Sequence, residues 1–172
     1  MAKEQRRPGD FIIEVATRGQ DVTSLFLFLF SSKKARDIAA CLSISATILA
    51  EAGNTTNRNA EYFKDSFQSK FESLLAKFTN VYDKISAACE KVTSLKPSDN
   101  PVKPFQGPLE KLIWAFGMNE EEFSDFSEWF KECYEPSALL NTLVNLVVLQ
   151  INAQRYVFIQ DSKLIFSVAI SH

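Results

Sequence analysis

Side chains able to do acid–base or nucleophilic chemistry are few in this sequence and stand far apart. The only histidine is His172, the last residue. Ser–His–Asp and Cys–His catalysis both need a histidine beside the nucleophile, and carboxylate-bridged metal bundles need an inward Glu-x-x-His pair. We therefore expect no enzyme and no catalytic residue in this chain.

A second candidate site is the run of three acids Glu120, Glu121 and Glu122. Consecutive helical residues point about 100° apart, so these carboxylates do not converge on one ion. They suit the solvated first turn of a helix, where the helix dipole favours negative charge. The five glycines form neither a GxGxxG nor a GxxxxGK[ST] phosphate loop. We expect no metal, no cofactor and no cofactor-binding residue.

The three cysteines, Cys41, Cys89 and Cys133, are odd in number and widely separated. This spacing favours buried, reduced thiols in a cytoplasmic protein over a disulfide framework or a metal cluster. Near the N-terminus, Pro8-Gly9-Asp10 stands where a signal peptide needs its apolar core, so no signal peptide is expected. The sequence shows no unbroken apolar stretch of the length a membrane span needs.

The length and charge of the chain further limit the class of protein to which it can belong. The chain has 172 residues, a formal net charge of −2 and fifteen phenylalanines. That length suits a single domain, and phenylalanine supplies much buried area to a small helical core. Acids and bases are interspersed, without the basic stripe that phosphate neutralisation needs, so no nucleic acid partner is expected.

The strongest local pattern lies between Asn59 and Lys96. Apolar residues alternate there at four-three spacing, which predicts one long helix whose wide apolar stripe suits the core of a bundle. The stripe comprises Phe67, Phe71, Leu74, Phe78, Val81, Ile85, Ala88, Val92 and Leu95, widened by Tyr62, Phe63, Tyr82 and Cys89.

Two helices are predicted before this one. The first covers Asp10–Phe30, although its LFLFLF run could also form a buried strand; helix is preferred because the rest of the chain is helical. The second covers Lys33–Ala52, with Ser31 or Ser32 as its N-terminal cap and Gly53 as its C-terminal cap. A turn is expected at Asn54–Asn57.

Four prolines between Lys96 and Pro108 predict a linker inside the domain. After it we expect a helix over Leu109–Phe116, with Pro108 at its first position and Gly117 at its end. Asn119 should cap another helix, whose apolar face contains Phe123, Phe126, Phe130 and Cys133 and which Pro136 breaks or kinks.

The last predicted helix, Ser137–Tyr156, is apolar nearly all round, which indicates a central buried helix. The run Leu164–Ile170 (LIFSVAI) has β-type character. Residues 157–172 are therefore interpreted as a separate tail, packed, disordered or the product of a mis-assigned gene end, the last being favoured. Together these patterns predict an all-α fold: one domain over residues 1–156, a helical bundle of four to six helices with one long central helix.

Particular residues also carry a family resemblance. Within Ser31–Gly53 (SSKKARDIAACLSISATILAEAG), an Ala-Arg-x-Ile-Ala pattern is followed by Leu-Ser and Ile-Leu pairs and closed by Ala-Gly. A Lys-Leu-x-Trp-x-Phe stretch follows the linker, and the last predicted helix is leucine-rich. The residues concerned are Ala35, Arg36, Ile38, Ala39, Leu42, Ser43, Ile48, Leu49, Ala52, Gly53, Lys111, Leu112, Trp114 and Phe116.

Over roughly Val22 to Arg155, the chain resembles the N-terminal helical domain of fungal NLR-like (STAND) receptors and related multidomain fungal proteins. The family's usual small-residue N-terminal helix is replaced here by Phe11–Arg18 and LFLFLF. The resemblance implies a helical bundle of the cell-death and signalling type, with no catalytic residues to carry over.

Three hypotheses of function follow. The first is a non-enzymatic regulatory or signalling module that binds a protein partner or associates with itself. The alternative is a membrane-active cell-death effector that uses residues 10–30; a membrane partner is less favoured, because six apolar residues span about 9 Å as helix against a hydrocarbon core of roughly 30 Å. The third is a bundle that binds a small apolar ligand between its phenylalanine-rich helices.

Overall fold

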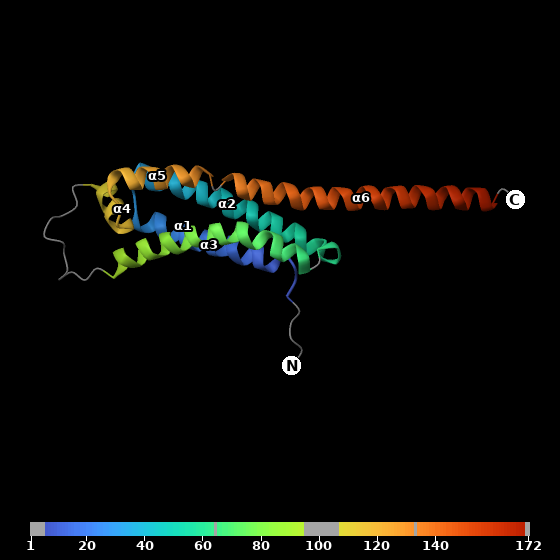
Figure 1. The fold of residues 1–172 in the computed structure, drawn as a ribbon, viewed down its shortest axis with the longest axis horizontal. Coiled ribbons are helices and arrows are strands. Elements are labelled where there is room, and N and C mark those ends of the chain that lie inside the picture. The colour runs from blue at the N-terminus through green and yellow to red at the C-terminus, as the bar shows by residue number, and fades with distance from the viewer. Residues whose placement is uncertain (1–5, 64, 95–106, 133, 171–172) are drawn as a thin grey trace, which may run out of the picture.

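The computed structural model of the chain describes residues 6–63, 65–94, 107–132 and 134–170, without the side chains of residues 65–70, 74, 129–132, 134–136 and 161–170. The described residues form six α-helices and one 3-10 turn, and they include no strand (Figure 1). The predicted all-α bundle is therefore confirmed. The elements are α1 (Asp10–Leu29), α2 (Lys33–Arg58), η1 (Ala60–Tyr62), α3 (Asp65–Thr93), α4 (Pro108–Phe116), α5 (Glu120–Glu132) and α6 (Tyr134–Ile170).

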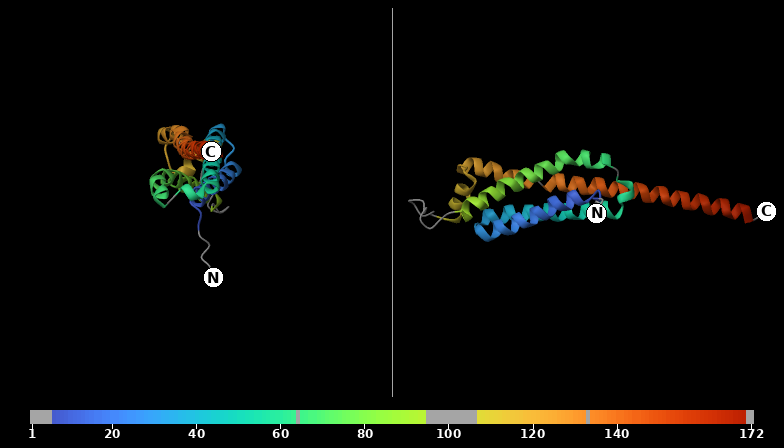
Figure 2. Two further views of the ribbon diagram at one scale, coloured as in Figure 1. Left: turned by 90° about the vertical axis from the view of Figure 1, so that its right-hand side faces the viewer. Right: turned by 90° about the horizontal axis from the view of Figure 1, so that it is seen from below.

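The bundle is elongated, and most of its helices run along the long axis. Helices α1, α2 and α3 run back and forth beside one another, and α4 and α5 lie together at one end (Figures 1 and 2). Helix α2 contacts α1, α4, α5 and α6, so it is the hub of the bundle. Helix α6 packs on α2 and α5, and its C-terminal part extends beyond the other helices.

Helix α1 includes almost all of the LFLFLF run, which is therefore helical and not a strand. Phe26 and Phe30 from this run are buried in the core, at 0% and 2% exposure. Their rings lie 5.0 Å apart between centroids. The spacing of four places both rings on the same side of the helix, while Leu25, Leu27 and Phe28 remain exposed.

The start of α2 was predicted correctly, but its end was not. The hydroxyl of Ser32 accepts a hydrogen bond from the backbone N–H of Ala35, as a helix cap should. The helix then continues through Gly53 and the predicted turn to Arg58. Gly53 serves a packing role instead, because a Cβ there would lie 2.6 Å from Cγ1 of Ile13 on α1.

The long helix predicted over Asn59–Lys96 is divided. The turn η1 precedes α3, which runs from Asp65 to Thr93. The predicted stripe is buried where its side chains are described, with Val92 half-buried. Phe67, Leu74 and Leu95 lie outside the described side chains. The buried members are Phe71, Phe78, Val81, Ile85 and Ala88, together with Phe63, Tyr82 and Cys89 from the widened stripe.

Both predicted ends of α4 and the predicted start of α5 are confirmed in detail. Pro108 is the first residue of α4, and Gly117 ends that helix in the left-handed conformation, with φ of 67°. The backbone N–H of Glu122 donates to Oδ1 of Asn119 over 2.8 Å, and the N–H of Asn119 donates to Oε2 of Glu122 over 2.9 Å. This reciprocal pair is a capping box. It gives Glu122 a capping role at the start of α5.

Aromatic packing holds α5 on α4. The ring of Phe116 lies 5.6 Å from that of Phe123 and 5.1 Å from that of Phe126, between centroids. Phe123 and Phe126 are buried as predicted. The side chains of Phe130 and Cys133 lie outside the described residues, as does most of the predicted linker, residues 95–106.

Three predictions about the C-terminal region are wrong. Helix α6 begins at Tyr134, so Pro136 lies in its first turn, where the missing N–H is tolerated, and does not break α5. The helix does not end at Tyr156 but continues to Ile170, so the LIFSVAI run is helical and not β-type. Finally, α6 is not buried all round, because Leu139, Leu146 and Leu149 are each more than half exposed.

Candidate interaction surface

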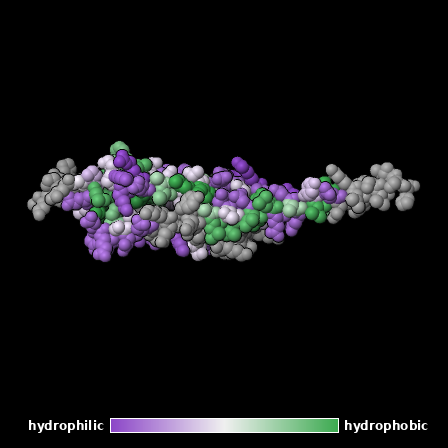
Figure 3. All heavy atoms as spheres, turned by 90° about the horizontal axis from the view of Figure 1, so that it is seen from above, coloured by the Kyte–Doolittle hydropathy of each residue, from purple (hydrophilic) through white to green (hydrophobic). Residues whose placement is uncertain are grey.

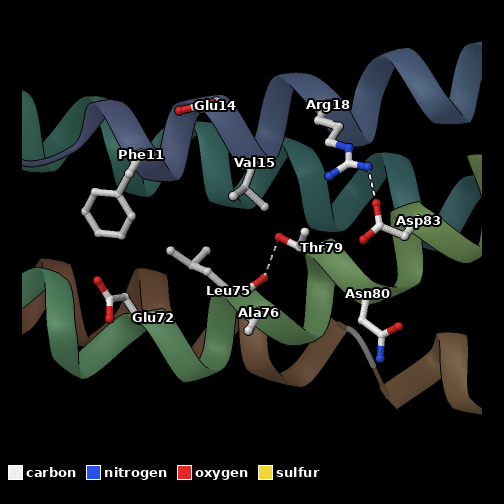
Figure 4. Close-up of a pocket in the computed structure, with 10 residues that line it drawn as sticks. All are labelled: Phe11, Glu14, Val15, Arg18, Glu72, Leu75, Ala76, Thr79, Asn80 and Asp83. Atoms are coloured by element: carbon white, nitrogen blue, oxygen red, sulfur yellow. Dashed lines mark hydrogen bonds and ion pairs between the residues drawn. The ribbon is translucent and has the colours of Figure 1, made fainter.

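A groove with a volume of about 580 Å³ lies between α1 and α3. Phe11, Val15 and Leu75 form apolar walls, while charged side chains stand at the rim (Figure 4). Arg18 of α1 forms an ion pair with Asp83 of α3 across the groove. A second rim acid, Glu14, pairs with Arg6.

Thr79, another polar residue of this groove, forms a hydrogen bond within its own helix. The hydroxyl of Thr79 donates to the carbonyl oxygen of Leu75 in its own helix over 3.2 Å. Charged pairs between exposed side chains contribute about 0–1 kcal/mol, so this rim holds two helices together weakly. The arrangement supplies surface contact between α1 and α3, without a nucleophile beside a base.

The two described cysteines are Cys41 on α2 and Cys89 on α3. Burial, helped by the nearby charge of Glu90, raises the pKa of the Cys89 thiol from 9.0 to about 11. Cys41 lies half-buried on α2, and both thiols are free. Within the described residues, no three His, Cys, Asp or Glu side chains gather closely enough to hold a metal ion.

Helix α2 is the one described helix long and apolar enough to cross a membrane by length and composition. Its apolar face has another explanation in this structure. Ile38, Leu42 and Leu49 are at most 2% exposed and belong to the core, where α2 contacts four other helices. Core helices of bundles pass the same test of length and composition.

The most unusual surface of the molecule is the outer face of α6. Six large apolar side chains on it are 39–65% exposed. On a helical wheel they fall within an arc of about 140°, as wide as the apolar stripe of a helix that packs on a core. Figure 3 shows apolar side chains running along this side of the molecule toward the projecting end of α6. We call these residues the outer stripe: Leu139, Leu143, Leu146, Leu149, Tyr156 and Val157.

The same helix carries a second apolar face that does pack on the bundle. Leu140 and Val144 are fully buried, and Val147 and Val148 are partly buried against the core. This inner face lies about 150° around the helix from the centre of the outer stripe. Helix α6 is thus apolar on two sides, and the bundle covers only one of them.

No charged residue occurs between Ser137 and Gln154. The polar residues of this stretch are serine, threonine, asparagine and glutamine, which carry no net charge. Asn145 donates from Nδ2 to Oδ1 of Asn141 over 3.4 Å, one turn away on the same helix. This stretch of α6 is therefore uncharged, unlike the charged rim of the α1–α3 groove.

Arg155 marks the point at which α6 leaves the bundle. Its Nη2 atom donates to Oε1 of Glu61 in η1 over 2.8 Å. Its guanidinium also stands 4.9 Å from the ring centroid of Tyr62. Beyond this anchor, Val157, Phe158 and Ile159 are 52–73% exposed, on the part of α6 that projects from the bundle (Figure 1).

Sequence reasoning did not find the outer stripe. It interpreted the leucines and valines of Ser137–Tyr156 as one continuous apolar surface and so predicted burial. The signal that separates the two faces is the position of Asn141, Asn145 and Asn152. These residues lie along one line of the helix, between the inner face and the outer stripe.

No family model, curated protein or solved structure matches this chain.

Proposed function

We propose that this chain is a non-enzymatic regulatory or signalling module that works by binding another protein surface, with the outer stripe of α6 as its binding element. The observation that carries the proposal is the exposure of six large apolar side chains on an uncharged helical face. On an ordinary protein surface, exposed apolar residues are scattered singly. A contiguous exposed apolar surface of this kind marks an interaction site.

The energetics support a binding role. Full burial of a leucine side chain is worth roughly 1.5–3 kcal/mol. The outer-stripe residues retain about half of their exposure, so covering all six would release on the order of 6 kcal/mol. That gain is comparable to the lower estimates of the rotational and translational cost of association. A partner that also covers the projecting end of α6 would bind more tightly.

The resemblance to fungal NLR-like N-terminal domains supports the same class of function, since those domains are helical modules of signalling proteins. It also supports a cytoplasmic location. An interaction module needs a stable body and one accessible surface, and the described part of this chain provides both. We propose no catalytic residue, cofactor or metal.

Site-specific photocrosslinking in cells tests the proposal. A benzophenone amino acid replaces Leu146 in the full-length protein, and a matched control carries it at Ile44, an exposed apolar position of α2. We expect crosslinked adducts of defined mass at position 146 and none at position 44. Equal labelling at both positions, or none at 146, contradicts the proposal.

A second candidate function, membrane activity of residues 10–30, has one observation in its favour. Phe28 is 86% exposed, with Leu25 and Leu27 partly exposed beside it at the end of α1. The opposing cost is large, because Ile12 and Phe26 of the same helix are completely buried. Insertion of α1 would strip these residues from the core, so we favour the interaction module.

Liposome leakage separates the two candidates. Substitution of Phe28 by Glu leaves the buried face of α1 intact but places a charge where insertion would begin. If the chain permeabilises membranes through α1, Phe28→Glu should abolish leakage of an entrapped dye. Leakage that is absent, or unchanged by the substitution, excludes this use of residues 10–30.

A further inference from the structure

Four residues of the outer stripe, Leu139, Leu143, Leu146 and Val157, fall on a coiled-coil seam that Gln150 and Ala153 complete. These six seam residues follow one another at intervals of four, three, four, three and four. Such alternation keeps side chains on one line of a helix that faces another helix, because it averages 3.5 residues per turn. The seam positions are Leu139, Leu143, Leu146, Gln150, Ala153 and Val157, flanked by Leu149 and Tyr156.

We propose that the occupant of this seam is the outer stripe of a second copy of the chain, so that the protein is a parallel, in-register dimer. The inference rests on the proposed function and names its partner. The two bundles would lie away from the seam, since the inner face of α6 is about 120° around the helix from the line of the seam residues.

The charge distribution is compatible with a second copy and disfavours a charged partner. In a two-fold dimer the same patch meets itself, so any net charge on it would repel its own copy. The stretch Ser137–Gln154 carries no charge at all. A basic or acidic partner would find no complementary group there, whereas an identical neutral surface meets no repulsion.

The polar residue in the seam favours the parallel register. A parallel, in-register dimer places Gln150 opposite Gln150 of the second copy, and each side-chain amide can donate to and accept from the other. A single polar residue at a core position of a coiled coil specifies register in this way. An antiparallel dimer centred on the seam would instead place Gln150 opposite Leu146, leaving the amide without an amide partner.

The seam covers almost three heptads of α6. From Leu139 to Val157 it extends for about 27 Å at 1.5 Å per residue. The remaining helix to Ile170 continues in the same direction beyond the bundle, so further turns can pair without obstruction from the body of either copy.

Light scattering on the purified full-length chain tests the dimer. The mass of one chain is 19.4 kDa, and we expect a particle of twice that mass at micromolar concentration. The double substitution Leu143→Glu/Leu146→Glu should weaken association at least 100-fold and give the single-chain mass. The controls Asn152→Glu, on another face of α6, and Ile44→Glu, on α2, should remain dimeric, with circular dichroism confirming folding of all four proteins.

Cysteine trapping tests the register. Mild oxidation of Gln150→Cys should convert most of the protein to a disulfide-linked dimer, whereas wild type and Asn152→Cys should not be trapped. A wild-type protein of single-chain mass, or a dimer that survives Leu143→Glu/Leu146→Glu, overturns the proposal. A dimer that Gln150→Cys fails to trap overturns the parallel register. Crosslinks from position 146 to a different protein, with a single-chain mass in solution, would retain the interaction module but reject the second copy.

Discussion

Gly19 of α1 lies directly against the ring of Tyr82 of α3. A Cβ on Gly19 would be 2.5 Å from both Cζ and Oη of Tyr82, closer than such atoms approach in real proteins. Tyr82 itself is completely buried. Two helices far apart in sequence are thus fitted to each other by a missing side chain on one and a large ring on the other.

The first prediction is that Gly19→Ala destabilises the protein, although alanine normally stabilises a helix interior. Replacing glycine by alanine in a helix should gain about 0.5–1 kcal/mol. Here the added methyl group displaces Tyr82 from a packed core, and overpacking of this kind costs typically 1–3 kcal/mol. We expect a net fall in the free energy of unfolding, measured by urea denaturation. Gly107→Ala is the control, since no atom lies within 4 Å of the added Cβ. A Gly19→Ala variant with an unchanged free energy of unfolding would contradict the contact with Tyr82.

The same contact shows what sequence reasoning could and could not reach. The stripe from Phe71 to Ala88 follows from local spacing, which one helix determines alone. The roles of Gly19 and Gly53 depend on which helix crosses them, and that is set by packing between distant segments. Gly53 therefore looked like a helix end, whereas its position against Ile13 keeps it inside α2.

The outer stripe escaped prediction for a related reason. Leu140 and Leu139 are neighbours of identical chemistry, yet one is fully buried and the other is 54% exposed. The number of sides of α6 that the bundle covers depends on how many other helices surround it. The amino-acid composition of α6 does not contain this information. The capping box of Asn119 and Glu122 was predictable because all its atoms lie within one turn.

The second prediction concerns acid stability at the start of α1. The backbone N–H of Arg7 and the side chain of Asn57 donate hydrogen bonds to Asp10 and hold the pKa of its carboxyl below the ordinary 3.8. Because the folded pKa is depressed, the stabilisation is present above about pH 4 and is lost as pH falls through the folded pKa. We expect Asp10→Asn to reduce stability at pH 7 and to flatten the decline between pH 5 and pH 2, as followed by thermal melts. Parallel curves for the two proteins would contradict this role.

The third prediction concerns Cys89, whose pKa is raised from 9.0 to about 11 by burial and by Glu90. The unfolded chain ionises this thiol above pH 9 while the folded chain does not. Stability is therefore complete below pH 9 and is lost as pH rises toward 11, at about 1.4 kcal/mol for each unit of pKa difference. Denaturant titrations at pH 8, 9 and 10 should show this decline, and Cys89→Ala should show a smaller one. An equal decline in stability with pH for wild type and Cys89→Ala would refute this prediction.

The raised pKa has a kinetic counterpart in thiol labelling. At pH 8, in a Cys133→Ser background, a disulfide reagent should modify Cys41, which is half-buried, before Cys89, which is completely buried. The thiolate is the reacting form, so a buried thiol of high pKa reacts only through opening of the fold. Labelling of Cys89 should accelerate with urea. Rapid modification of both thiols in buffer would exclude a closed core at this position.

The last prediction concerns the anchor of α6. Arg155 binds Glu61 and stands over Tyr62, so it ties the helix to η1 where α6 leaves the bundle. Both partners of the ion pair are exposed, and such pairs contribute about 0–1 kcal/mol to global stability. Arg155→Ala should therefore leave the melting temperature nearly unchanged but increase hydrogen exchange in residues 150–158. Gln154→Ala, at the neighbouring exposed position, should leave exchange unaltered. The N-terminal half of α6 still packs on the bundle without this anchor, so it still presents Leu139, Leu143, Leu146 and Leu149. Loss of the anchor should therefore weaken the proposed dimer less than Leu143→Glu/Leu146→Glu does.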